Sequence, residues 1–201
     1  DGDVVLPSVF MPPLYGYLIY FVKIISFDLI DIAFLIINIQ IVISLITILI
    51  FFKLISNFQN VKVSLLFSLI FSLFPIYIFA SVQISSVVLQ LFFIIIFLFS
   101  IVNLLKKQNY LYLTLFSIVS GLLILTRGEF ILFYFFSIFY FFVYLKRSYK
   151  NVIISIILTS LIITPYLKRN FENYGTLVLT KSVGYNLLKG NNPLAEAEGN
   201  T

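Results

Sequence analysis

The chain has 201 residues, of which 61% are hydrophobic and 10% are charged, and its formal net charge is +5. Soluble domains carry about a quarter charged residues, so a water-soluble globular fold is excluded, and the scattered basic residues give no nucleic-acid signal. Cysteine and histidine are absent, which excludes disulfides, thiolate nucleophiles, Cys/His metal sites and an imidazole base.

The N-terminal part does not resemble a first membrane span. Residues 1–13 are polar and rich in turn formers, and we read them as the end of an extracytoplasmic loop. Residues 14–27 are apolar, too short to cross a bilayer, and carry Lys23, which predicts an interfacial helix. The chain does not begin with methionine and ends in a polar stretch, so we expect it to be a piece of a longer protein.

Six apolar runs follow, most of them near the ~20 residues that a vertical membrane helix needs. They cover residues 29–52, 63–80, 85–105, 110–126, 130–145 and 151–167. None of them alternates between apolar and polar residues, as a strand of a transmembrane β-barrel does. The sequence therefore predicts an all-α polytopic membrane bundle over residues 28–167, with about six transmembrane helices plus the interfacial helix, followed by an extracytoplasmic segment over residues 168–201.

The orientation of the chain across the membrane can be predicted from the charges in its short loops. The connections at 53–62, 106–109 and 146–150 contain lysine and arginine and no acid, whereas 81–84 has no charge and 127–129 has one of each sign. Positive-inside bias places the basic loops in the cytoplasm, so both ends of the chain lie outside. We expect a multi-pass protein of the bacterial inner or plasma membrane, with its site on the extracytoplasmic face.

Two groups of charged residues stand at the outer ends of predicted spans. Arg127 and Glu129 form either a tight turn that reaches water or a phosphate site in which Glu129 orients the arginine fork. Lys168 and Arg169 either face a helix C-terminus and lipid phosphates or clamp a lipid-linked phosphate. The residues alone leave both pairs of readings open.

Other polar residues have simpler explanations. Asp28 is predicted to cap the first span, with Asp31 in its first turn, and Gln83 and Gln90 are predicted to bond between helices. The sequence does not decide whether Asp1 and Asp3 solvate a loop or belong to a site. We find no internal repeat of the kind that transporters often carry.

Four stretches carry a family resemblance in their order and spacing: PPLY at 12–15, LTRGE at 125–129, TPYLKRNFENYG at 164–175 and GYNLLKGNNP at 184–193. They resemble the membrane domain of GT-C-fold glycosyltransferases, in particular the family of protein O-mannosyltransferases and the lipid A aminoarabinose transferase. Gly128 stands where that family usually has proline, and Tyr166 where it usually has tryptophan. The family's catalytic carboxylate lies in the first outer loop, upstream of Asp1, so no catalytic residue is assigned and the piece is expected to be inactive alone.

The resemblance implies transfer of a sugar from a polyprenyl-phosphate donor to a glycan, lipid or protein acceptor at the outer face. Membrane lipids are expected partners and nucleic acid is not. Arg127, Lys168 and Arg169 would bind the donor phosphate, Glu129, Asn170 and Tyr15 would support them, and Gly190, Asn191 and Asn192 would form a substrate loop. No cofactor is expected, since the lipid-linked sugar is a substrate, and a divalent metal is left open. The alternatives are a lipid-carrier transporter or flippase, which would use the same cations, and a structural subunit.

Overall fold

The computed structural model describes residues 9–26, 30–107, 109–143, 149–181 and 191, and these contain eight helices and no strand. The protein is therefore all-α over the described ranges, as predicted. The helices are α1 (Leu14–Ser26), α2 (Ile32–Ile55), α3 (Val61–Ser72), α4 (Pro75–Val82), α5 (Val87–Lys106), α6 (Tyr110–Thr126), α7 (Phe130–Val143) and α8 (Tyr149–Tyr174).

Fewer helices than predicted are long enough to cross a membrane. Among the described residues, α2, α5 and α8 meet the length and hydropathy of a span, and α3 with α4 counts as a fourth if the bent pair crosses as one. The apolar helices α6 and α7 have 17 and 14 described residues. A 17-residue helix is only about 25 Å long, against ~30 Å of hydrocarbon. The structure is consistent with an integral membrane protein that has three or four candidate spans, and the predicted number of six is too high by this measure.

The predicted span 63–80 is broken in the middle. α3 and α4 meet at an angle of 55°, and Phe74, between them, has an extended backbone with φ −69° and ψ 118°. Pro75 follows at the first position of α4. Proline has no N–H to donate and disfavours the helical conformation of the residue before it. The break is therefore the local consequence of Pro75.

The last helix is longer than predicted. α8 continues through Pro165 to Tyr174, so residues 168–174 are helical rather than loop. Gly175, with φ 67°, then ends the helix, and its N–H donates to the Phe171 carbonyl at 2.8 Å. Glycine adopts this left-handed conformation at a helix C-terminus without steric cost. At 26 residues, α8 is about 39 Å long and exceeds the hydrocarbon thickness.

The cap of α2 also differs from the prediction. The N-cap residue is Asp31, whose carboxylate accepts from the Ala33 N–H at 3.0 Å. The sequence reading placed Asp28 there, three residues earlier; Asp28 lies outside the described residues. In both cases an aspartate caps the helix, and a carboxylate at a helix N-terminus stabilises it.

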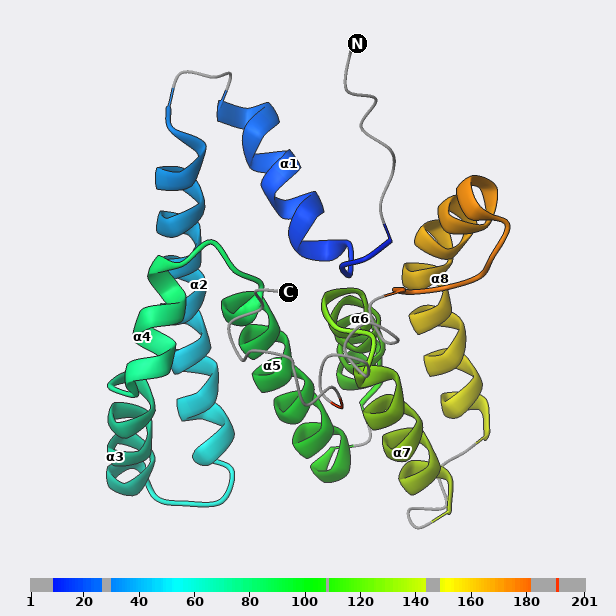
Figure 1. Cartoon of the computed structure of the whole chain (residues 1–201). Coiled ribbons are helices and arrows are strands. Elements are labelled where there is room, and N and C mark those ends of the chain that lie inside the picture. Colours follow the sequence, from blue (N-terminus) through cyan, green and yellow to red (C-terminus); the bar gives the residue numbers. More distant parts are fainter. Residues whose placement is uncertain (1–8, 27–29, 108, 144–148, 182–190, 192–201) are drawn as a thin grey trace.

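The bundle is arranged around α6, which packs between α5 and α8, while α2 packs on the other side of α5 and carries α3 and α4 (Figure 1). The α2–α3 and α5–α6 connections lie at one end. The α6–α7 turn, α1 and the C-terminal end of α8 lie toward the other (Figure 1). The lysines at the ends of α2 and α5 are thus separated along the bundle from Arg127, Lys168 and Arg169. The sequence predicted this separation; which end faces the cytoplasm stays a prediction.

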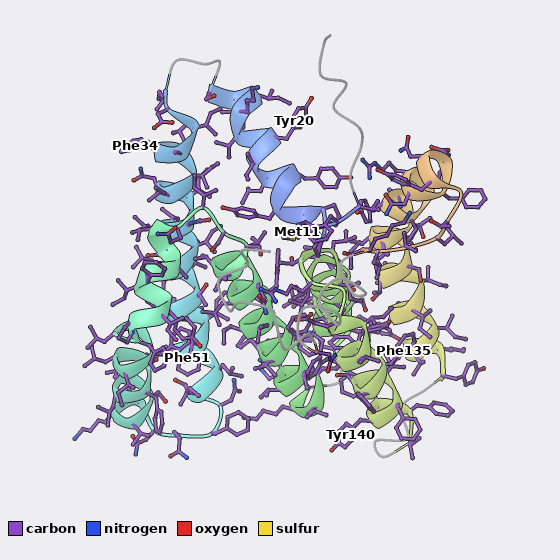
Figure 2. The ribbon with its side chains drawn as sticks, in the orientation of Figure 1. Met11, Tyr20, Phe34, Phe51, Phe135 and Tyr140 are labelled. Atoms are coloured by element: carbon purple, nitrogen blue, oxygen red, sulfur yellow. The ribbon has the colours of Figure 1, made fainter. Side chains whose placement is uncertain are left out.

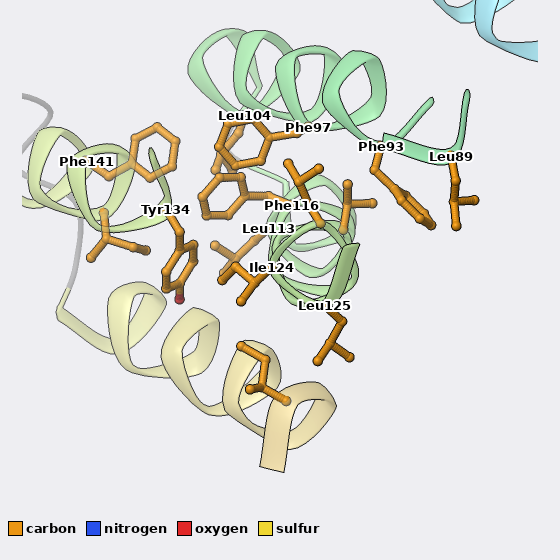
Figure 3. Packing of buried hydrophobic residues seen from close by; sticks show 14 of the residues in the cluster. Leu89, Phe93, Phe97, Leu104, Leu113, Phe116, Ile124, Leu125, Tyr134 and Phe141 are labelled. Atoms are coloured by element: carbon orange, nitrogen blue, oxygen red, sulfur yellow. The ribbon is translucent and has the colours of Figure 1, made fainter. Parts of the chain in front are cut away.

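The core is aromatic and centred on Phe116 of α6, whose side chain is fully buried. Its ring centroid lies 5.3 Å from that of Phe97, 5.7 Å from that of Tyr134 and 5.4 Å from that of Phe141 (Figure 3). Beside this cluster, the Ser117 hydroxyl donates to Ser155 Oγ at 2.8 Å. Aromatic contacts and an interhelical hydrogen bond together hold α6 against α5, α7 and α8.

The outer surface is also apolar. Tyr20, Phe34 and Phe135 are 64%, 60% and 57% exposed, and Figure 2 shows Phe34 on the outer side of α2. Exposed apolar side chains of this kind occur on every element from α1 to α8. Soluble monomers rarely expose large continuous apolar patches. This surface is the one expected of helices that lie against lipid.

Candidate functional site

The α6–α7 turn carries the first predicted phosphate ligand. Arg127 follows α6 with an extended backbone, φ −152° and ψ 116°, and its N–H donates to the Leu123 carbonyl at 2.9 Å. The guanidinium Nη1 lies 3.7 Å from Glu129 Oε1, and the two side chains are 43% and 61% exposed. An ion pair of this separation and exposure contributes little stability. The pairing agrees with either sequence reading, a turn that reaches water or an arginine oriented by Glu129.

The two cations of α8 take different partners. Lys168 Nζ lies 3.7 Å from Glu172 Oε1, and the lysine side chain is exposed beside Phe171 and Leu177. Arg169 Nη1 donates to Asn170 Oδ1 at 2.9 Å, and the guanidinium carbon lies 5.9 Å from the Tyr166 ring centroid. Tyr166 and Asn170 are buried. Arg169 therefore reaches toward the packed side of α8, whereas Lys168 lies on its exposed side. Consecutive helical residues differ by about 100° in direction.

After α8 the chain turns back along the bundle. We call residues 176–181 the return segment (the orange coil beside α8 in Figure 1). Its Val178 carbonyl accepts from Asn170 Nδ2 at 2.7 Å. The Thr180 hydroxyl donates to the Phe10 carbonyl at 2.6 Å, and the Lys181 N–H donates to the Val9 carbonyl at 2.9 Å. The segment therefore joins the end of α8 to the residues just before α1.

The return segment also lies beside the turn that holds Arg127. A Cβ placed on Gly128 would lie 3.8 Å from Thr180 Cγ2 and 3.9 Å from Leu179 Cβ. Leu179 packs against the core cluster. The structure thus gathers three separate stretches at one end of the bundle: the α6–α7 turn, the C-terminal end of α8 and the residues before α1. The sequence motifs pointed to each stretch, and the contacts between them were not predictable from spacing.

Tyr15, predicted as a supporting residue, is part of a polar cluster that sequence reasoning missed. Its hydroxyl donates to Gln40 Oε1 at 2.6 Å, and Gln40 Nε2 donates to the Ser81 and Gln83 carbonyls at 3.2 and 2.7 Å. Gln40 is only 1% exposed. Burial raises the pKa of the Tyr15 hydroxyl above its ordinary value, because the charged phenolate is disfavoured away from water. Gln83 enters this cluster through its backbone carbonyl.

The signal for Gln40 was present in the sequence as a glutamine inside the apolar run 29–52. An amide at this depth normally bonds to a neighbouring helix, because lipid offers it no partner. Here the partners are carbonyls at and just after the C-terminal end of α4, where a helix leaves its last carbonyls without intrahelical donors. Gln40 therefore links α1, α2 and α4.

The structure describes part of the remaining predicted residues. Asn191 is described and exposed, whereas Gly190, Asn192, Asp1 and Asp3 lie outside the described residues. The three carboxylates in the described ranges are Asp31, Glu129 and Glu172, and each has the cap or ion-pair contact given above. Within these ranges no three His, Cys, Asp or Glu residues are grouped so that they could hold a metal ion.

The chain matches no protein-family model, no curated protein and no solved structure. The resemblance to GT-C glycosyltransferases therefore rests on the four motifs alone and stays a prediction.

The glycine at the α6–α7 turn can be tested directly. Gly128→Ala should change the free energy of unfolding by less than about 1 kcal/mol, because the added Cβ would meet its neighbours at ordinary contact distances of 3.8 and 3.9 Å. Detergent-induced unfolding followed by circular dichroism measures the change. A loss of several kcal/mol would show that the turn needs glycine, and the family's usual proline at this place would then be incompatible with this backbone.

Proposed function

We propose that the chain is the membrane part of a glycosyltransferase that moves a sugar from a polyprenyl-phosphate carrier to an acceptor at the outer membrane face. The observation that carries the proposal is that the turn holding Arg127 and the part of α8 holding Arg169 both lie beside the return segment, at the end of the bundle opposite to the lysines in the last turns of α2 and α5. A lipid phosphate lies at headgroup level, where such a group of cations can meet it.

The chemistry suits these cations. Breaking the bond between the sugar and the carrier phosphate leaves additional negative charge on the phosphate, and preplaced guanidinium donors stabilise charge that develops in the transition state. Arginine donates two parallel hydrogen bonds to a phosphate and stays charged at any physiological pH. We assign this role to Arg127 and Arg169, and a weaker, long-range role to the exposed Lys168. A carboxylate in an outer loop upstream of Asp1 is the expected acceptor of the proton.

The proposal includes the finer topology. Six crossings, with α3–α4 as one bent span and α6 and α7 as short spans, return the chain to its starting side. With the basic loops in the cytoplasm, Arg127, Lys168 and Arg169 all lie outside. Short helices cross by local thinning of the bilayer or by residues that reach to the interface.

The test is sugar transfer by the intact protein in proteoliposomes, with decaprenyl-phosphate mannose as the probe donor and extracted membrane lipids, glycans or peptides as acceptors. Arg169→Ala should lower transfer by about 100-fold, the usual effect of removing one donor to a developing charge. Lys168→Ala is the matched control and should lower it by less than about threefold, since an exposed and ion-paired lysine contributes little. Equal losses in the two variants, or none in Arg169→Ala, would contradict the assignment.

A second candidate function is transport of a lipid carrier. One observation favours it: α3 and α4 form a broken helix that lines, with α2 and α5, a cavity of about 180 Å³. Transporters bind substrates at discontinuous helices near the middle of the membrane. Protein that moves fluorescent decaprenyl phosphate between leaflets, without sugar transfer, would support this function over the enzyme.

A further inference from the structure

Asn170 has two chemically different contacts, one at each end of its carboxamide. Its Oδ1 accepts from Arg169 Nη1 at 2.9 Å and its Nδ2 donates to the Val178 carbonyl at 2.7 Å. The residue is fully buried. Only a group with an acceptor and a donor on one planar end can serve both partners, so neither aspartate nor leucine replaces it. Both contacts matter because an unsatisfied polar group is costly at a buried position.

The two partners belong to different parts of the candidate site. Arg169 is one of the proposed phosphate ligands. Val178 belongs to the return segment, whose Leu179 and Thr180 lie beside Gly128 of the Arg127 turn. Asn170 therefore contacts both the return segment and the Arg169 guanidinium.

We propose that Asn170 is a positioning residue that couples the orientation of Arg169 to the placement of the return segment. An arginine held by a buried neighbour loses less conformational freedom when it binds an anion, so this contact prepares the site for a phosphate ester. Coupling is reciprocal: a change at Arg169 alters the return segment, and release of the segment alters Arg169. The role toward phosphate rests on the proposed function, whereas the coupling itself does not.

The coupling is testable without ligand. The chain has no cysteine, so Leu179→Cys introduces a single thiol on the return segment, and its rate of modification by a maleimide reports how well the segment is held. Asn170→Asp keeps an acceptor for Arg169 but loses the donor to Val178, and should raise the rate about tenfold. Thr180→Val removes the bond to the Phe10 carbonyl and should raise it by a similar factor.

The decisive comparison is between the neighbouring cations. Arg169→Met should raise the modification rate at position 179 about threefold, because Asn170 loses the donor that orients it. Lys168→Met, whose side chain contacts Glu172 instead, should leave the rate unchanged. An unchanged rate in Asn170→Asp or in Arg169→Met would overturn the coupling, and so would an equal rise in Lys168→Met.

A second measurement addresses the ligand: affinity for decaprenyl phosphate in nanodiscs. Asn170→Asp should weaken binding at least tenfold, because its carboxylate would pair with Arg169 and neutralise it. Thr180→Val, which releases the return segment and so alters Arg169, should weaken binding about threefold. Asn173→Asp is the charge control: it adds the same charge on α8, at a position where the wild-type amide donates to the Arg169 carbonyl at 2.8 Å and not to the guanidinium. Equal weakening in both aspartate variants would overturn the positioning of Arg169. If the wild-type chain does not bind this lipid, the proposed function fails, and the modification rates still decide the coupling.

Discussion

Replacing Gln40 with leucine should lower the free energy of unfolding by about 2–4 kcal/mol. The change removes three hydrogen bonds and leaves the Tyr15 hydroxyl and two carbonyls, those of Ser81 and Gln83, without this partner at a site that is 1% exposed. Buried groups left unsatisfied cost about 1–3 kcal/mol each in water-soluble proteins, and interhelical bonds in membranes average closer to ~0.6 kcal/mol. For three groups these figures give about 2 kcal/mol at the lower limit and about 9 kcal/mol at the upper, and the expected value lies in the lower part of that range.

The measurement is unfolding in mixed micelles of increasing SDS, followed by circular dichroism. Tyr15→Phe removes one of the three bonds and should cost about 1 kcal/mol. Asn38→Leu is the matched control, since this exposed side chain on α2 bonds only to the Phe34 carbonyl of its own helix, and it should change stability by less than about 0.5 kcal/mol. If Gln40→Leu cost no more than Asn38→Leu, the cluster would have no part in holding α1 and α4 to α2.

Helix positions were largely predictable because apolar runs in this chain are interrupted by turn formers and charges. The predicted run 110–126 coincides with α6, which begins after Asn109 and ends before Arg127. The break between α3 and α4 had a visible signal in Pro75, which the length of the apolar run concealed. Proline in a membrane helix is ambiguous from sequence, since Pro75 breaks a helix and Pro165 does not.

The candidate site was predictable as a set of residues and not as an arrangement. Because α8 continues past Pro165, the side chains of Lys168 and Arg169 leave the helix in directions about 100° apart. A loop at this place would have allowed both side chains to face one ligand. Contacts of the return segment with Val9 and Phe10 join residues about 170 positions apart, as for Thr180 and Phe10. The local sequence of either stretch does not predict this pairing, because contacts between distant segments depend on how the helices pack together.

Gly121→Leu should lower the free energy of unfolding by about 3 kcal/mol or more. Even a Cβ at this position would lie 2.9 Å from Cβ and Cγ2 of Ile162 on α8. Close contact of this kind forces the two helices apart. Separation would also strain the bonds from Ser117 to Ser155 and from Thr159 to the Ser117 carbonyl, which are 2.8 and 2.9 Å long. Packing and hydrogen bonding at the α6–α8 contact therefore fail together.

The same SDS titration measures this loss, with Gly16→Ala as the control. Among the described residues, apart from its chain neighbours and its own helix backbone, nothing lies within 4 Å of a Cβ at Gly16, so alanine there should be neutral or stabilising by up to ~1 kcal/mol, the difference in helix propensity. Gly121→Ala should cost about 1–3 kcal/mol despite the same propensity gain, and adding Ile162→Ala should recover part of it. If Gly121→Ala behaved like Gly16→Ala, α6 and α8 would not approach as closely as the structure has them. Since Arg127 directly follows α6 and Arg169 lies on α8, the spacing of these two helices at Gly121 is a condition for the proposed site as well as for the fold.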